Sequence, residues 1–181
     1  MLVGCATGFP EGQDAGDLTA ADVEAQDARV FVPDGSVTLD AEPPLPDAAP
    51  CVGGAAQVVG PEGHCYLFFN DSQTWSSARL SCDALVPPAH LATITTAEEN
   101  ALLAPNLGNA DWFIGFSDGE LEGTFRWVTG ETLSYTHWRS GEPNNGNGTV
   151  DEDCAVLEGQ TGALWDDRAC GSTYRHICER E

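Results

Sequence analysis

Residues 139–170 read RSGEPNNGNGTVDEDCAVLEGQTGALWDDRAC, and this stretch determines the fold that the sequence predicts. Residues 139–153 form a long polar segment with a single aliphatic residue, Val150. Residues 154–157 and 163–165 are short apolar runs separated by turn residues, a pattern that predicts the two arms of a β-hairpin. A polar loop of that length has no hydrophobic reason to keep one shape, so something other than apolar packing has to order it.

Side-chain oxygens are concentrated in and around this loop. The residues that carry them are Glu142, Asn144, Asn145, Asp151, Glu152 and Asp153 in the loop, Asp166 and Asp167 on the hairpin, and Asp118 and Glu122 further upstream. Two bare carboxylates about 4 Å apart repel by roughly 4 kcal/mol at an effective dielectric constant of about 20. Calcium turns that repulsion into attraction, and it accepts roughly six to eight oxygen ligands where magnesium requires a tighter octahedron. The pattern therefore leaves two interpretations, a calcium site or a solvated acidic loop.

Upstream of the loop, residues 51–138 supply the remainder of a folded domain. Residues 74–84 predict a helix. The side chains available to its buried stripe are Trp75, Ala78, Leu80 and Cys82. Thr96 and Glu99 form a capping box that begins a second helix through Leu103, and Pro105 ends it. Short strands are predicted at residues 65–69, 112–116, 125–128 and 177–179. Two helices followed by short strands predict an α+β domain.

Residues 6–50 differ in composition, being rich in Asp, Ala, Gly and Pro with Phe9 and Phe31 as the only aromatics. Such a stretch buries too little apolar surface to offset its chain entropy, so we expect a disordered, acidic, Pro-rich tether. Residues 1–5 include Leu2-Val3-Gly4-Cys5, which resembles the lipobox of bacterial lipoproteins. That resemblance implies the remnant of a signal peptide whose true start lies upstream, and a lipid on Cys5. The alternative is that Cys5 is an unpaired thiol in a flexible terminus.

Charge and cysteine spacing exclude several classes of function. The chain has 29 acidic and 7 basic residues and a formal charge of −22, which argues against nucleic-acid binding and against docking on anionic lipid. Its seven cysteines lack the Cys-x-x-Cys spacing of zinc sites and indicate disulfides in an oxidising compartment. No apolar run is long enough to span a membrane, so membrane attachment is expected only through a lipid anchor. The sequence also lacks an activated nucleophile, an HExxH motif and a phosphate loop, so we expect no enzyme.

Three motifs, together with the order of the cysteines, resemble the C-type lectin domain. The motifs are Trp112-Phe113-Ile114-Gly115-Phe116 (close to the family's WIGL), Glu142-Pro143-Asn144, and Trp165-Asp166-Asp167 (close to WND). The resemblance covers residues 51–181 and implies a fold with two helices, two small antiparallel sheets and a long calcium-binding loop. It also implies three disulfides, Cys51–Cys65 in the extra hairpin of long-form domains, Cys82–Cys178 and Cys154–Cys170, which leave Cys5 alone.

The resemblance further implies two calcium sites. A sugar-binding calcium would be held by Glu142, Asn144, Glu152, Asp166 and Asp167. A second, structural calcium would be held by Asp118, Glu122, Asn145, Glu152 and Asp153. In the family the bond between Glu142 and Pro143 is cis. The loop between Asn144 and Glu152 is slightly longer than in compact mannose binders, so Asp151 competes with Glu152 for the metal.

The implied function is calcium-dependent carbohydrate binding at an extracytoplasmic surface, with glycans as partners. A carboxylate ligand only accepts hydrogen bonds whereas an amide also donates, so Glu142 and Asn144 together satisfy a sugar hydroxyl. In the family the order Glu-Pro-Asn goes with mannose, glucose, N-acetylglucosamine and fucose. Asp166 stands where the family usually has Asn and cannot donate, which predicts that Asp166→Asn strengthens mannose binding. The alternative is a C-type-lectin-like adhesion or protein-interaction module that does not bind sugar.

Overall fold

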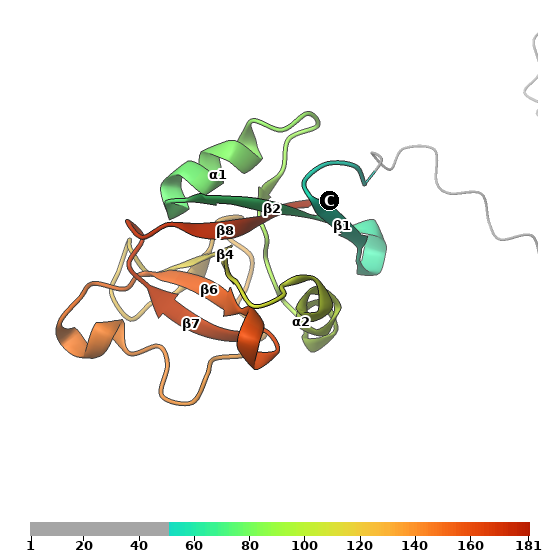
Figure 1. Cartoon of the computed structure of the whole chain (residues 1–181). Coiled ribbons are helices and arrows are strands. Elements are labelled where there is room, and N and C mark those ends of the chain that lie inside the picture. The colour runs from blue at the N-terminus through green and yellow to red at the C-terminus, as the bar shows by residue number, and fades with distance from the viewer. Residues whose placement is uncertain (1–50) are drawn as a thin grey trace, which may run out of the picture. The chain divides into compact units, whose positions relative to one another are not determined.

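The computed structural model describes residues 51–181, which form an α+β domain (Figure 1). The strands are β1 (Ala56–Val59), β2 (Cys65–Gln73), β3 (His90–Leu91), β4 (Asp111–Ser117), β5 (Arg126–Trp127), β6 (Cys154–Glu158), β7 (Leu164–Arg168) and β8 (Tyr174–Arg180). The helices are α1 (Trp75–Asp83) and α2 (Ala97–Leu103), with short 3-10 turns at Pro61–Gly63, Ala104–Asn106, Asn145–Gly148 and Gly159–Thr161. The predicted tether at residues 6–50 and the lipobox-like residues 1–5 lie outside the described residues.

Both helices begin at side-chain caps, of which the sequence predicted only the capping box of α2. Thr74 caps α1 by accepting a hydrogen bond from the Ser77 N–H, and Thr96 and Glu99 form the capping box of α2. The chain leaves α2 after Leu103 and tightens into a 3-10 turn. One expectation was wrong, because Leu80 is 68% exposed rather than part of the buried stripe of α1. It follows Ala78, which is buried, by two positions, and such residues face different sides of a helix.

The strands follow one hydrogen-bonded path in the order β1-β2-β8-β4-β6-β7, with β3 added to β8 and β5 to β4. Every pair is antiparallel except β4 and β8, which run parallel at Trp112 and Phe113. Two small antiparallel sheets were expected; this short parallel contact instead joins the strands into one eight-stranded sheet. The β6–β7 hairpin therefore lies at the opposite end of the path from β1, on the far side from α1 (Figure 1).

Aromatic packing and disulfides fix the β6–β7 hairpin in place. The ring of Trp165 on β7 lies 5.7 Å from Trp127 and 5.6 Å from Phe116, centroid to centroid, in edge-to-face contacts. The Trp165 indole N–H donates to Asn100 Oδ1 of α2 at 2.8 Å. The disulfides join the three pairs that the resemblance implies, Cys51–Cys65, Cys82–Cys178 and Cys154–Cys170. Strand β7 is consequently a rigid base for the acidic residues that follow Trp165.

Candidate calcium site

Strand β7 places two adjacent acidic residues inside the protein. Asp166 pairs with Val156 and Asp167 with Ala155 across the β6–β7 hairpin, and both aspartates are almost completely buried. Removing a carboxylate from water costs several kcal/mol unless it is hydrogen-bonded or paired with a cation. The partners of these two side chains therefore indicate what the site is built to hold.

The segment before the polar loop is attached to β7 through its backbone. The Arg139 N–H donates to the Trp165 carbonyl and the Trp165 N–H to the His137 carbonyl, each at 2.8 Å. The chain then turns through a cis bond between Glu142 and Pro143, as the resemblance implies. These contacts bring one oxygen each of Glu142, Asp166 and Asp167 within 4.8 Å of one another. We call these three residues the β7 cluster.

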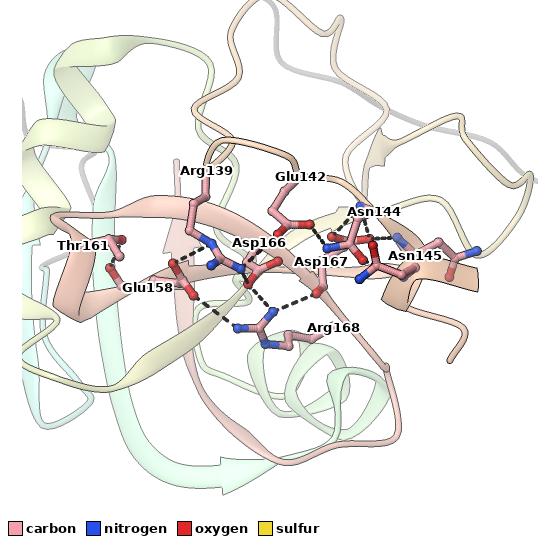
Figure 2. A network of polar contacts seen from close by, with 10 residues as sticks. Arg139, Glu142, Asn144, Asn145, Glu158, Thr161, Asp166, Asp167 and Arg168 are labelled. Carbon is pink, nitrogen blue, oxygen red and sulfur yellow. Dashed lines mark hydrogen bonds and ion pairs between the residues drawn. The ribbon is translucent and has the colours of Figure 1, made fainter. Parts of the chain in front are cut away.

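The loop itself folds onto Asp167. The backbone N–H groups of Asn144 and Asn145 both donate to its carboxylate, at 3.0 and 2.7 Å (Figure 2). The Asn144 amide also donates to Glu142, the acceptor two residues earlier. Among residues 51–181, the carboxylate of Glu152 is not grouped with the β7 cluster. The Glu152 backbone N–H donates to Asn145 Oδ1 at 2.7 Å. The structure thus gathers four of the five residues expected around the first calcium, and the Glu152 carboxylate is not within 4.8 Å of all three oxygens of the β7 cluster.

A second acidic group, the loop cluster, consists of Glu122, Asp151 and Asp153, with one oxygen of each within 4.8 Å. Asn145 connects to it because its amide donates to Glu122 Oε1 at 2.9 Å. Asp118 lies beside it, and its backbone N–H donates to the Asp153 carbonyl at 3.1 Å. Four of the five residues expected around the second calcium thus lie together, without the Glu152 carboxylate, and they are joined by Asp151, which was expected only as a competitor of Glu152.

Two arginines that were not predicted as site residues surround Asp166 (Figure 2). Arg139 Nη2 lies 2.6 Å from Asp166 Oδ2 and 2.9 Å from Glu142 Oε1. Arg168 contacts the same Asp166 oxygen through Nη1. Glu158 holds both guanidinium groups, with its Oε2 3.3 Å from Arg139 Nε and its Oε1 3.2 Å from Arg168 Nη2. The sequence did contain one signal, since Arg168 follows Asp166 by two positions and therefore shares its face of the strand.

The electrostatics of both clusters favour an added cation. Burial raises the pKa of the Glu142 carboxyl, and the charge of Asp166 raises it further. Burial also raises the pKa of Asp118 and of Asp153, with the charges of Glu122 and Asp151 adding to the respective shifts. One oxygen of Asp166 and one of Asp118, both Oδ1, are buried without a hydrogen-bond partner. The potential metal ligands of both clusters are carboxylate oxygens, without histidine nitrogen or cysteine sulfur. Such ligands suit a hard divalent cation such as calcium rather than zinc.

One other group of potential metal ligands does not qualify. Cys82, His176 and Cys178 lie close together in the core. The two cysteines form a disulfide with each other, so neither sulfur is a thiolate that could bind a metal. Among residues 51–181, no helix has the length and apolar character needed to cross a membrane.

Sequence comparison finds relatives with the same domain. A family model described as the Lectin C-type domain matches residues 71–180. Lectin BRA-3 of Megabalanus rosa is 35% identical over 119 residues, which are 65% of this chain and 72% of that protein. The C-type lectin mannose-binding isoform of Notechis scutatus scutatus is 33% identical over 123 residues, 65% of this chain and 77% of that protein. The human C-type lectin domain family 17, member A, is 34% identical over 121 residues, 66% of this chain, but the match spans only 30% of its length.

Solved structures of similar fold agree with these relatives. The cow C-type carbohydrate-recognition domain of CD23, solved in the presence of a GlcNAc2Man3 oligosaccharide, has a TM-score of 0.63 and is 29% identical. The alignment covers 71% of this chain and 95% of that domain. Human lithostathine, at 24% identity and a TM-score of 0.64, shares the fold; its alignment covers 78% of this chain and 99% of that chain. The family consists of binding proteins rather than enzymes, and this chain belongs to it as a member with a C-type lectin domain.

Proposed function

We propose that this chain binds carbohydrate, and that it does so through calcium held by the β7 cluster. Glu142, Asp166 and Asp167 would be ligands, and Asn144 and Glu152 would complete the set. The observation that carries the proposal is Asp166, which belongs to a cluster of three carboxylates and whose buried Oδ1 has no hydrogen-bond partner. An orphaned buried acceptor costs about 1–3 kcal/mol, so its retention is explained if a cation completes it.

The sugar class follows from the pairing of Glu142 with Asn144. A bound calcium would offer two open positions to adjacent hydroxyls of a sugar ring. Next to it, Glu142 offers an acceptor and Asn144 a donor, and the two groups already face each other. This mixed pair matches a hydroxyl that donates one hydrogen bond and accepts another. Together with the order Glu-Pro-Asn, it favours glycans of the mannose, glucose, N-acetylglucosamine or fucose type.

The loop cluster would hold a second calcium in the same proposal. Glu122, Asp151 and Asp153 would supply carboxylates, with Asp118 and Asn145 beside them. Its support is weaker because Glu122 and Asp151 are exposed, so water can already solvate them. The role that fits its position is to stiffen the loop that carries Asn144, rather than to contact sugar.

Calorimetry with the purified chain tests the proposal directly. We expect calcium to bind with measurable heat, mannose to bind only in calcium, and galactose to bind more weakly. Glu142→Ala should abolish mannose binding. Glu131→Ala, which replaces an exposed acid that is not part of the cluster, should leave mannose binding intact. The absence of calcium heat, or equal mannose binding in calcium and EDTA, would refute the proposal.

One observation favours a second candidate, an adhesion or protein-interaction module without sugar binding. Asp166 offers only acceptors where an amide would offer a donor as well. A chain that binds calcium but retains no glycan on an array, in calcium or in EDTA, would favour this function.

We also propose an extracytoplasmic location, either secreted or anchored as a bacterial lipoprotein. The support is the set of three disulfides, which persist in oxidising compartments. Cys5 lies outside the described residues, so its lipidation rests on the sequence alone. Mass spectrometry of the protein from its natural host would detect a lipid on Cys5, and loss of the membrane-bound fraction in Cys5→Ser would test its role.

A further inference from the structure

We propose that Arg139 determines ligand specificity at the β7 cluster by donating to a ligand oxygen the hydrogen bond that Asp166 cannot donate. The inference rests on the proposed function, because it concerns how the same site holds its sugar. Asp166 offers a carboxylate where the family usually offers an amide donor. The guanidinium group of Arg139 lies against both Asp166 and Glu142.

The first step is the charge balance around Asp166. Its carboxylate and that of Glu158 add two negative charges, and Arg139 and Arg168 add two positive charges in direct contact with them. The four groups are therefore neutral as a set. With an amide at position 166 the set would carry one positive charge, and the carboxylate of Asp166 brings it to zero, so its charge is balanced by the arginines that contact it.

The second step is that the arginines determine which oxygen of Asp166 remains available. Both guanidinium groups contact Oδ2, and Oδ1 has no hydrogen-bond partner. A planar guanidinium fixes a carboxylate more strictly than an ammonium does, because its donors have a fixed geometry. The arginines therefore occupy one oxygen of Asp166 and leave the other, Oδ1, available to a ligand.

The third step separates the roles of the two arginines. The nitrogens of Arg168 are engaged by Asp166, Glu158 and the Asp167 carbonyl, and its side chain is only 23% exposed. The side chain of Arg139 is 41% exposed, and within residues 51–181 its Nη1 has no hydrogen-bond partner. Arg139 is therefore the arginine that can reach a ligand, whereas Arg168 is a positioning residue.

Arg139 also has the right position relative to the other ligand-binding groups. The Arg139 backbone N–H donates a hydrogen bond to the Trp165 carbonyl, so the backbone from which its side chain extends is held against β7. From there its Nη2 reaches Glu142, which accepts from Asn144 as well. A sugar hydroxyl near Asp166 would thus meet a carboxylate acceptor and a guanidinium donor, a charge-assisted arrangement in place of carboxylate and amide.

The test compares Arg139→Met with Arg126→Met, a control that removes the same charge from an exposed arginine on β5. Calcium affinity is measured without sugar, and mannose affinity is measured in saturating calcium. We expect Arg139→Met to lower mannose affinity about tenfold or more while calcium affinity changes less than about threefold. Arg126→Met should change neither affinity. Guanidinium NMR signals of Arg139 should shift on adding mannose to the calcium-loaded wild-type protein.

A double variant distinguishes a missing donor from a damaged site. Asp166→Asn added to Arg139→Met restores an amide donor at position 166, so it should regain much of the lost mannose affinity. Three results would each overturn the inference. Mannose affinity could stay unchanged or rise in Arg139→Met, it could fall in parallel with calcium affinity, or it could fail to recover in the double variant. Failure of the wild-type chain to bind mannose in calcium would instead refute the proposed function itself.

Discussion

Two buried carboxylates on the same sheet, Glu179 of β8 and Asp166 of β7, have very different partners. Glu179 Oε2 accepts from the Thr93 N–H at 2.7 Å and from its hydroxyl at 2.9 Å, and Oε1 lies 2.7 Å from His64 Nδ1. Both oxygens of Glu179 are therefore satisfied. Asp166 has both arginines on one oxygen and no hydrogen-bond partner on the other.

The difference teaches how a buried acid reveals its role. A carboxylate whose acceptors are all occupied by the protein needs nothing further, so Glu179 is a structural group that fastens β8 to the segment around Thr93 and to His64. A carboxylate with an unoccupied buried acceptor beside other acids is incomplete without a cation. Changes at Glu179 should therefore affect stability, and changes at the β7 cluster should affect calcium binding.

The largest expected effect is on stability, from Glu179→Ala. The substitution leaves the Thr93 N–H and hydroxyl, and the His64 ring, without their acceptor. We expect a loss of about 3 kcal/mol in the free energy of unfolding, measured by urea denaturation in EDTA, with calcium affinity unchanged. Glu181→Ala, which removes an exposed acid two residues later, is the control. A parallel loss of calcium affinity in Glu179→Ala would break the comparison.

The opposite result is expected for Asp167→Ala in the β7 cluster. It removes both a proposed metal ligand and the acceptor of two loop N–H groups, those of Asn144 and Asn145. Calcium affinity should fall about 100-fold or more, equivalent to about 2.7 kcal/mol. The free energy of unfolding in EDTA should fall less than in Glu179→Ala, because Asn144 and Asn145 are only half-buried and water can replace the lost acceptor, whereas Thr93 is buried. Calorimetry measures the affinity, with Asp83→Ala at the exposed end of α1 as the control of equal charge. An affinity loss under about threefold would show that Asp167 is not a metal ligand.

The sequence predicted those features that depend on neighbouring residues. The capping box at Thr96 and the β6–β7 hairpin both follow from patterns within a few positions. The two helices and the strands at residues 65–69 and 112–116 appear where they were expected. Strands β1 and β3 were missed, because both are short and only partly buried, so their patterns are weak.

Features that depend on distant contacts were not predictable in the same way. The ion pair between Arg139 and Asp166 joins residues 27 positions apart, and it forms because β7 and the loop entrance are attached through their backbones. The bond from the Glu152 backbone N–H to Asn145 depends on how the long loop closes, which composition does not determine. The candidate ligands could be identified from residue type and resemblance. The two arginines that contact Asp166 could be identified only once the fold was known.

Smaller effects on both stability and calcium affinity are expected from Asn100→Ala in α2. Asn100 accepts from the Trp165 indole and donates to the Ala163 carbonyl, so it supports β7 from α2. Losing both bonds in the core should cost about 2 kcal/mol in the free energy of unfolding. Calcium affinity should fall only about three- to tenfold, because Asp166 keeps its arginines. Asn109→Ala, at an exposed asparagine, is the control, and a calcium loss as large as that of Asp167→Ala would contradict the separation.

The smallest expected effect is a pH dependence of stability that arises at His64 on the satisfied side of the comparison. Burial lowers the pKa of His64, but the hydrogen bond and charge of Glu179, with smaller effects of Glu181 and Glu99, outweigh burial and raise it overall. A histidine whose pKa is raised in the folded state contributes stability fully below its unfolded pKa of about 6.5. That contribution disappears as the pH rises through the folded pKa, because the ring is then neutral in both states.

His64→Gln isolates this contribution, because glutamine keeps a donor for Glu179 but cannot become charged. In EDTA, wild type should be more stable than His64→Gln by less than about 1 kcal/mol at pH 6, since the ring is partly exposed and solvent weakens the pair. The gap should narrow steadily as urea unfolding is repeated up to pH 9. A gap that stays constant or widens with pH would mean that Glu179 gains nothing from a charged partner. Its full satisfaction would then rest on the neutral donors alone, and the contrast with the arginine-paired Asp166 would become sharper.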